Sequence, residues 1–170
     1  MKDTPKSSKA MKKEIKLKPI GIIHTPYKEP KGMPIQGKFE KGVTGHVKLF
    51  PEYIKGLKDI EGFSHIILIY YFDRSKEEKL ITRPFLEDEE HGIFAIRSPH
   101  RPNHIGFSVV KVEEVNDDTV IFSEVDTLDG TPLLDIKPYV SHFDLRKNIR
   151  NGWIEKHFKS GKIPKRTRLK

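Results

Sequence analysis

The sequence predicts a mainly β domain, either an antiparallel barrel or a sandwich, with few helices. Six or seven short apolar segments are typical of strands, and strands do not alternate with helices along the chain. The chain contains neither GxGxxG nor GxxxxGK[ST], the glycine-rich loops of nucleotide-binding α/β folds. These observations argue against a doubly wound parallel sheet.

The first strand is expected over residues 15–25, where alternation gives way to a continuous apolar run that ends before Pro26. Residues 27–45 are rich in Gly, Pro and charge, and such a long irregular segment in a compact domain is usually functional. Residues 45–50 then predict a short strand. The following PEYIKGL predicts a short helix with Pro51 in its first turn.

The run FSHIILIYYF, residues 63–72, is apolar almost without interruption and predicts a central strand buried on both faces. Residues 73–90 are highly charged and predict a surface excursion with no evident function.

The decapeptide RSPHRPNHIG, residues 97–106, combines guanidinium, imidazole and amide groups with two prolines. It lies between expected strands at 92–96 and 107–115, so it predicts a rigid functional loop. The acidic turn at 116–118 then predicts a hairpin with a strand over 119–126.

Asp135, Lys137 and Tyr139 occupy every second position of a further extended segment, so they are expected on one face. From residue 144 to about 161 the spacing predicts one amphipathic helix. Its apolar positions are Leu145, Ile149, Trp153, Ile154 and Phe158.

The net charge of +8 is concentrated at the two ends of the chain. Residues 1–18 carry seven Lys and Arg against two Asp and Glu, residues 145–170 carry ten against one, and the body between them is acidic. We expect a disordered basic tail over 1–14, a domain over 15–144, and a helix with a basic tail over 145–170. Such ends are either solubilising tails or arms that bind phosphate.

The chain has no cysteine, which excludes thiol nucleophiles, redox pairs and cysteine-ligated zinc. It also has no apolar run of about 18 residues and no apolar signal region, so we expect a soluble cytoplasmic protein without a membrane partner. His100 and His104 are four residues apart, but Pro102 between them disfavours a helical metal-binding pair. We therefore expect no metal.

Arg97 and Arg101 are the strongest candidates for binding a carboxylate or phosphate, because a guanidinium offers a fixed fork of donors. The alternative is that such an arginine anchors its own loop by hydrogen bonds to carbonyls. Two other unusual loops, around Gln36 and Asp129, also combine Pro or Gly with polar ligand-binding groups, although Asp129 precedes Gly and could simply form a turn.

The motifs GIIHTPY, PIQG, RSPHRPNHIGFS and DGTPLLDIKPY occur in this order. From about Lys18 to Asp144 the chain closely resembles the TrmO family, also called the TsaA-like, YaeB or VirR family. The resemblance implies a single antiparallel β-barrel with a few short helices, without the C-terminal domain of longer members. It also implies a homodimeric S-adenosylmethionine-dependent methyltransferase acting on tRNA, at the exocyclic nitrogen of threonylcarbamoyladenosine next to the anticodon.

The resemblance implies cofactor contacts at Pro34, Ile35, Gln36, Phe72, Asp73, Arg97, Phe107, Asp126, Thr127, Leu128 and Asp129. Our hypothesis is that Phe72 or Phe107 stacks on the adenine, Asp129 accepts from the ribose hydroxyls and Arg97 pairs with the methionine carboxylate.

The candidate catalytic residues that would remove or relay the proton of the acceptor nitrogen are Tyr139, Asp135 and Asn103. Arg101 and Lys137 are candidates for binding the substrate, through anticodon phosphates or the threonyl carboxylate. Three residues depart from the family pattern: Ile35, Asp73 and His104. They leave open a non-catalytic RNA-binding module, or a methyltransferase for another base or a small molecule.

Overall fold

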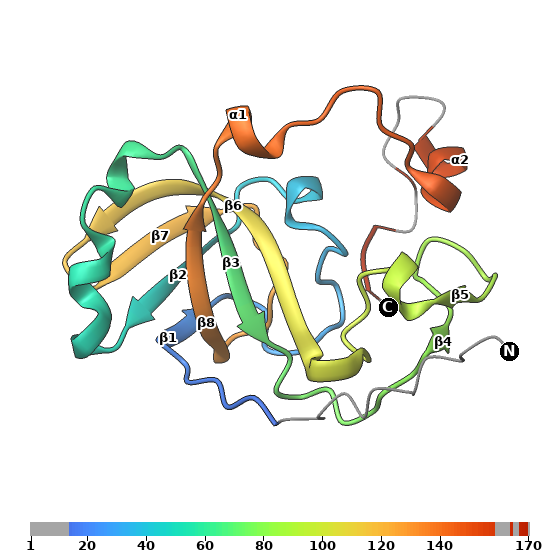
Figure 1. Cartoon of the computed structure of the whole chain (residues 1–170), viewed down its shortest axis with the longest axis horizontal. Helices are drawn as coiled ribbons and strands as arrows, with labels where there is room; N and C mark the ends of the chain where they lie inside the picture. The colour runs from blue at the N-terminus through green and yellow to red at the C-terminus, as the bar shows by residue number, and fades with distance from the viewer. Residues whose placement is uncertain (1–13, 159–163, 165–166, 170) are drawn as a thin grey trace, which may run out of the picture.

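The computed structural model describes residues 14–158, 164 and 167–169 and shows a closed antiparallel β-barrel (Figure 1). Its strand order is β1-β2-β7-β6-β3-β8. The barrel strands are β1 (Gly21–His24), β2 (Thr44–Leu49), β3 (His65–Tyr71), β6 (Ile105–Asn116), β7 (Thr119–Ser123) and β8 (Thr131–Pro138). A separate two-stranded sheet pairs β4 (Ile81–Thr82) with β5 (His91–Gly92). The predicted fold class is confirmed.

The helices of the described residues are all short. The α-helices are α1 (Ser141–Asp144) and α2 (Glu155–Phe158). The 3₁₀ helices are η1 (Gly37–Phe39), η2 (Pro51–Leu57), η3 (Ile60–Gly62), η4 (Ile93–Ala95), η5 (Pro102–His104) and η6 (Gly152–Ile154). In this part of the chain, no helix has the length and apolar character needed to cross a membrane.

The core fills the inside of the barrel with alternate residues of each strand. Val47 and Leu49 of β2 point inward, and Ile66 and Leu68 of β3 pack with Phe122 of β7. The expectation that β3 is buried on both faces was wrong. Ile67 and Ile69 on its outer face are only half-buried, because the outer face of a barrel wall has no second layer here.

The β6–β7 hairpin is confirmed, with Asn116 opposite Thr119. The first strand is shorter than expected, since it begins only at Gly21. Ile15 and Leu17 are exposed, so their alternation with lysines has no buried face to support a strand. The basic tail expected over residues 1–14 lies outside the described residues except for Glu14.

The prediction of a strand over residues 92–96 was wrong. Only Gly92 belongs to a strand, and η4 follows it. Ile93 and Ile96 are buried while Phe94 between them is 79% exposed. A spacing of three between buried residues fits a 3₁₀ turn rather than the two-residue period of a strand.

The prediction of one long helix from residue 144 was also wrong within the described residues. Asn148 and Gly152 have left-handed backbone conformations that interrupt a helix. Leu145 and Ile149 are 62% and 63% exposed, so the helical spacing has no core to pack against. The chain instead crosses from the barrel to the β4–β5 lobe (Figure 1). There Trp153 stacks on His91 and donates a hydrogen bond to the Ala95 carbonyl at 2.9 Å.

Candidate functional site

Three segments that are distant in sequence meet at one end of the barrel. Arg97, from the loop before β6, donates a hydrogen bond to Gln36 Oε1 at 2.6 Å. The same guanidinium lies 4.8 Å from the ring centre of Phe107 on β6, which is a cation–π geometry. We call Gln36, Arg97, Phe107 and Asp126 the mouth cluster.

Asp126 holds the mouth cluster to the barrel interior. Its carboxylate accepts hydrogen bonds from the Gly37 amide at 3.0 Å and from the Ser108 hydroxyl. Ser108 in turn contacts the Tyr70 hydroxyl at 3.0 Å. Burial raises the pKa of Asp126, while the Ser108 hydrogen bond, the Gly37 amide and the Arg97 charge oppose that shift. Burial, with the Asp126 charge, also raises the pKa of Tyr70.

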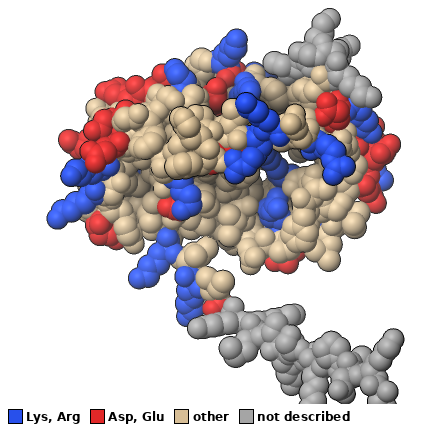
Figure 2. Space-filling view, turned by 45° about the horizontal axis from the view of Figure 1, so that its top comes forward, with Lys and Arg blue, Asp and Glu red and all other residues tan. Residues whose placement is uncertain are grey.

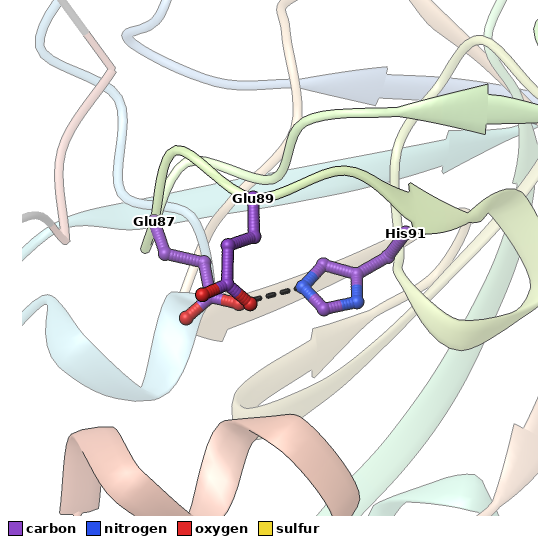
Figure 3. Close-up of side chains that lie close together, drawn as sticks. All are labelled: Glu87, Glu89 and His91. Carbon is purple, nitrogen blue, oxygen red and sulfur yellow. Dashed lines mark hydrogen bonds and ion pairs between the residues drawn. The ribbon is translucent and has the colours of Figure 1, made fainter.

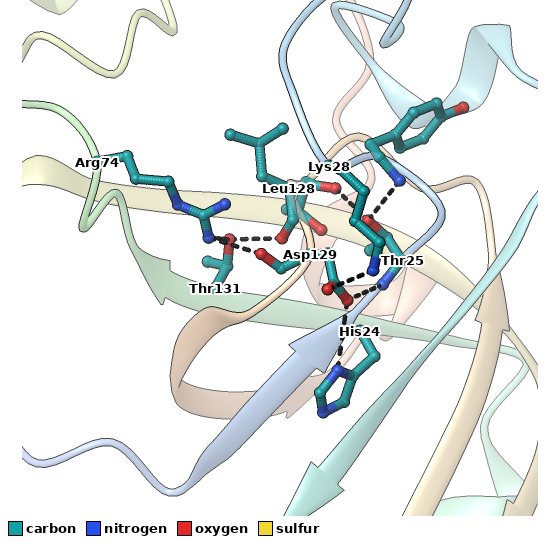
Figure 4. A network of polar contacts seen from close by, with 9 residues as sticks. His24, Thr25, Lys28, Arg74, Leu128, Asp129 and Thr131 are labelled. Carbon is teal, nitrogen blue, oxygen red and sulfur yellow. Dashed lines mark hydrogen bonds and ion pairs between the residues drawn. The ribbon is translucent and has the colours of Figure 1, made fainter.

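A second network surrounds Asp129 (Figure 4). Its carboxylate accepts from the Thr25 amide at 3.1 Å and from Lys28 Nζ at 2.6 Å, and it lies 3.3 Å from His24 Nδ1. The Lys28 hydrogen bond lowers the pKa of Asp129 to about 2, with smaller contributions from Thr25 and His24. An open hollow of about 500 Å³ adjoins this network, lined by His24, Lys28, His46, Ile121 and Asp129 among others.

Arg74 connects the end of β3 to this second network. It donates to the Asp129 carbonyl at 2.8 Å and lies 3.3 Å from the Asp73 carboxylate. Phe72, two residues before it, packs against Tyr70 and over Gly106, where a Cβ would lie 2.7 Å from the Phe72 ring. The glycine therefore permits this aromatic packing beside the mouth cluster.

The structure places all the predicted cofactor residues on, or next to, these two networks. Pro34 and Ile35 directly precede Gln36. The Thr127 carbonyl accepts from the Thr25 hydroxyl at 2.8 Å, and the Leu128 carbonyl accepts from the Thr131 hydroxyl at 2.7 Å. Both oxygens of Asp129 already accept from protein donors, so its expected contact with ribose stays a prediction that requires exchange with the exposed Lys28.

The candidate proton acceptors are not together. Asp135 and Lys137 share one face as expected and form an ion pair at 2.7 Å. Asp135 is opposite Ile69, which is opposite Phe107. The three side chains therefore share the outer face, with Asp135 about 10 Å from Phe107 across two strand spacings.

Tyr139 lies at the opposite end of β3, where its amide donates to the His65 carbonyl at 3.1 Å. His65 is four residues from Ile69, about 13 Å along the strand. The structure therefore does not bring Tyr139 to the mouth cluster.

The loop 97–106 is held by contacts within itself and with neighbouring segments. Arg101 donates to the Ile96 carbonyl at 3.1 Å, which is the anchoring arrangement considered as the alternative for this residue. His104 contacts the Pro99 carbonyl at 3.1 Å, and His100 contacts the Ser75 hydroxyl at 3.0 Å. Asn103 is exposed and has a left-handed φ of 63°, a conformation that asparagine tolerates.

Sequence reasoning missed several residues that position these networks: His24, Lys28, Arg74 and Ser108. His24 lies in the GIIHTPY motif and Arg74 directly follows Asp73, so both had a local signal. Ser108 is the last residue of the RSPHRPNHIGFS motif, but its contact to Asp126 depends on the β6–β7 geometry.

A separate polar cluster, the Glu87 cluster, joins α2 to the β4–β5 lobe. Glu87, Glu89 and His91 form the one group of three His, Cys, Asp or Glu residues in the described part of the chain whose possible metal-ligating atoms lie within 4.8 Å of one another (Figure 3). The buried Glu87 carboxylate already pairs with His91 at 2.6 Å, Lys156 at 2.6 Å and His157 at 2.7 Å. The arrangement is complete as an ion-pair cluster, and the expectation of no metal stays a prediction.

Because the Glu87 cluster joins residues 152–158 to the β4–β5 lobe, we expect acid to detach these residues from the lobe. Its hydrogen bonds, that of Lys156 first, lower the pKa of Glu87 from 4.5 to about 2. A lowered carboxyl pKa stabilises the attached form above pH 4.5, and this contribution is lost as the pH falls from 4.5 toward 2. Trp153 is the only tryptophan in the chain. Its fluorescence should therefore shift over this pH window.

Glu87→Gln should give the detached fluorescence already at pH 7. An exposed carboxylate of η2 provides the control, since Glu52→Gln should leave the spectrum and its pH dependence unchanged. A Glu87→Gln spectrum identical to that of the unmodified chain would contradict the role of this carboxylate.

The chain is similar to known proteins over most of its length. A family model described as the tRNA-methyltransferase O N-terminal domain matches residues 22–145. A probable S-adenosyl-L-methionine-binding protein from Pyrococcus abyssi is 56% identical over 140 residues, which cover 82% of this chain and 76% of that protein. A tRNA (adenine(37)-N6)-methyltransferase from Mus musculus is 39% identical over 102 residues, covering 58% of this chain and 23% of that protein.

A solved structure shows the same architecture. The crystal structure of TrmO from Pseudomonas aeruginosa superposes with a TM-score of 0.71 at 34% identity, covering 83% of this chain. The match spans 63% of that longer chain.

Proposed function

The chain belongs to the tRNA-methyltransferase O N-terminal domain family, and on this premise we propose that it binds S-adenosylmethionine and methylates tRNA. The proposed acceptor is the exocyclic nitrogen of threonylcarbamoyladenosine next to the anticodon. The observation that carries the proposal is the mouth cluster, in which Gln36 from one segment meets Arg97 and Phe107 from another.

The mouth cluster offers the groups that a methionine zwitterion and an adenine require. Arg97 is exposed, so its guanidinium can pair with a carboxylate while Gln36 and Phe107 hold it in place. Phe107 is 43% exposed and supplies an aromatic surface for stacking. Phe72 and Asp73 lie beside the adjoining Asp129 network, which would hold the nucleoside part.

Bound S-adenosylmethionine would supply an electrophilic methyl group on a sulfonium, so alignment of the acceptor nitrogen provides most of the acceleration. The protein's own contribution is then to orient the acceptor and take up its proton. Asp135 is better placed than Tyr139, because it shares the outer face of the sheet with Phe107. Tyr139 would act only on a substrate that extends along β3.

Exposed basic residues give the RNA a surface to bind. Figure 2 shows Lys and Arg side chains around an opening in one face of the molecule. In the connection between α1 and η6 the basic residues are Arg146, Lys147 and Arg150, all exposed. Lys137 on the outer face of β8 adds to them.

The salt dependence of tRNA binding tests this surface. Each phosphate contact adds about 0.7 to the slope of log K against log salt for a single strand. Replacing Arg146, Lys147 and Arg150 together with alanine should therefore reduce the slope by about 2. A matched replacement of Lys55 and Lys58, which flank the end of η2, should not change it. If the affinity of the unmodified chain for tRNA does not change with salt concentration, the proposed electrostatic role of this surface is wrong.

The reaction itself is tested by incubating the purified protein with S-adenosylmethionine and tRNA that carries or lacks threonylcarbamoyladenosine. Nucleoside mass spectrometry should find one added methyl group only on the modified base. Cofactor binding without transfer would favour a non-catalytic RNA-binding module, consistent with the departures at Ile35 and Asp73. Transfer in the absence of RNA would favour a small-molecule substrate.

We also propose a cytoplasmic homodimer. Tyr71 and Ile105 expose apolar surface at paired positions of β3 and β6, and such a patch favours a self-complementary interface. Sedimentation velocity should give the mass of two chains, and Tyr71→Glu should shift the protein to a monomer. A single-chain mass at micromolar concentration would contradict this assembly.

A further inference from the structure

The last described residues of the chain return to the loop that carries Gln36. Residues 167–169 form an antiparallel bridge in which Arg168 is opposite Pro34. The Gly32 amide donates to the Leu169 carbonyl at 2.8 Å, the Leu169 amide to the Met33 carbonyl at 2.9 Å and the Ile35 amide to the Thr167 carbonyl at 2.8 Å. These residues lie beyond the matched family domain, which ends at residue 145.

Arg168 fixes this pairing through its side chain. It donates to the Gly32 carbonyl at 2.9 Å and forms an ion pair with Glu40. The Glu40 side chain is only 10% exposed and lies close enough to Tyr27 to help burial raise the pKa of that phenol. Loss of Arg168 would leave a nearly buried carboxylate without its cation, which is costly.

The other end of the same loop forms part of the mouth cluster. Gln36 accepts the Arg97 hydrogen bond, and the Gly37 amide donates to Asp126. The segment 32–37 is therefore held from one side by residues 167–169 and from the other by the barrel. Without the first contact, the Gly32 amide, four residues before Gln36, and the Ile35 amide, directly before Gln36, lose their partners.

We propose that residues 167–169 form a C-terminal strap that holds loop 32–36 in the conformation needed to bind the cofactor, with Arg168 as its positioning residue. This inference rests on the proposed cofactor function. The strap contacts the loop through main-chain hydrogen bonds, so its removal should weaken binding through Gln36 and Arg97.

Hydrogen exchange in the absence of any cofactor tests the first half of the proposal. Deleting residues 164–170 should speed exchange in loop 32–36 at least 10-fold, while exchange in β3 stays as in the unmodified chain. Arg168→Ala should have a smaller effect in the same loop, and Arg168→Lys should restore part of the protection because it keeps the charge opposite Glu40. Arg83→Ala, an exposed arginine elsewhere, is the control. Unchanged exchange at Gly32 and Ile35 would overturn the strap.

Calorimetry with S-adenosylmethionine tests the second half. The deletion should lower affinity at least 10-fold, Arg168→Ala should fall between, and Arg83→Ala should bind as the unmodified chain does. Faster loop exchange with unchanged affinity would overturn the positioning role. If the unmodified chain itself binds no S-adenosylmethionine, the proposed function fails, and the exchange result alone decides whether the strap holds the loop.

Discussion

Replacing Gly37 with alanine should abolish binding of S-adenosylmethionine and destabilise the protein by about 2–3 kcal/mol. A Cβ at this position would lie 1.6 Å from the Glu124 carbonyl oxygen and 2.3 Å from its carbonyl carbon. These are backbone atoms, so no side-chain rotation can relieve the clash. Loop 32–37 must move away from the barrel, and the Gly37 amide then loses Asp126.

Urea unfolding and calorimetry measure the two effects of this change. Gly56→Ala is the matched control, because Gly56 lies in η2 with open space around its Cβ position. It should bind the cofactor as the unmodified chain does and unfold at the same or slightly higher urea concentration. Normal affinity in Gly37→Ala would show that the loop is not part of the site.

Replacing Arg97 with alanine should weaken cofactor binding about 100-fold, or about 3 kcal/mol. The reason is that the methionine carboxylate of the bound cofactor would lose its charged partner. Gln36 would also lose the donor that holds its side chain. The Arg97 charge lowers the pKa of Asp126, so its removal lets that pKa rise. The urea midpoint should change little, since Arg97 is exposed.

Two further variants test whether the loss of affinity is specific to the guanidinium of Arg97. Arg97→Lys keeps the charge but not the planar fork, so it should recover only part of the lost affinity. Arg83→Ala removes an exposed arginine of the β4–β5 lobe and should leave binding unchanged. Equal affinities for Arg97→Ala and the unmodified chain would remove Arg97 from the cofactor site.

The barrel strands were predictable because each carries a local signal. The acidic turn after Asn116 defines the β6–β7 hairpin, and Pro51 starts η2 as expected. The helical spacing from Leu145 to Phe158 was misleading, since spacing alone does not show whether a core is present to bury the apolar face. Exposure of Leu145 and Ile149 shows that here it is not.

The site was predictable only in part, because the sequence shows residue types but not which distant residues meet. The residue types at Gln36, Arg97 and Asp129 pointed to polar ligands, and the structure brings their loops to one end of the barrel. Their partners could not be identified from the chain order, because Thr25 and Asp129 are 104 positions apart and Gln36 and Arg97 are 61 apart. Such contacts depend on how the barrel closes.

Closure of the barrel also determines when the site can form during synthesis. β1 completes the ring by pairing with β8, where Gly21 is opposite Leu133. Contacts between such distant residues form late and make folding slow. A nascent chain therefore cannot assemble the Asp129 network until nearly the whole domain has left the ribosome, and a ligand that binds across this closure acts as a stabiliser of the completed fold.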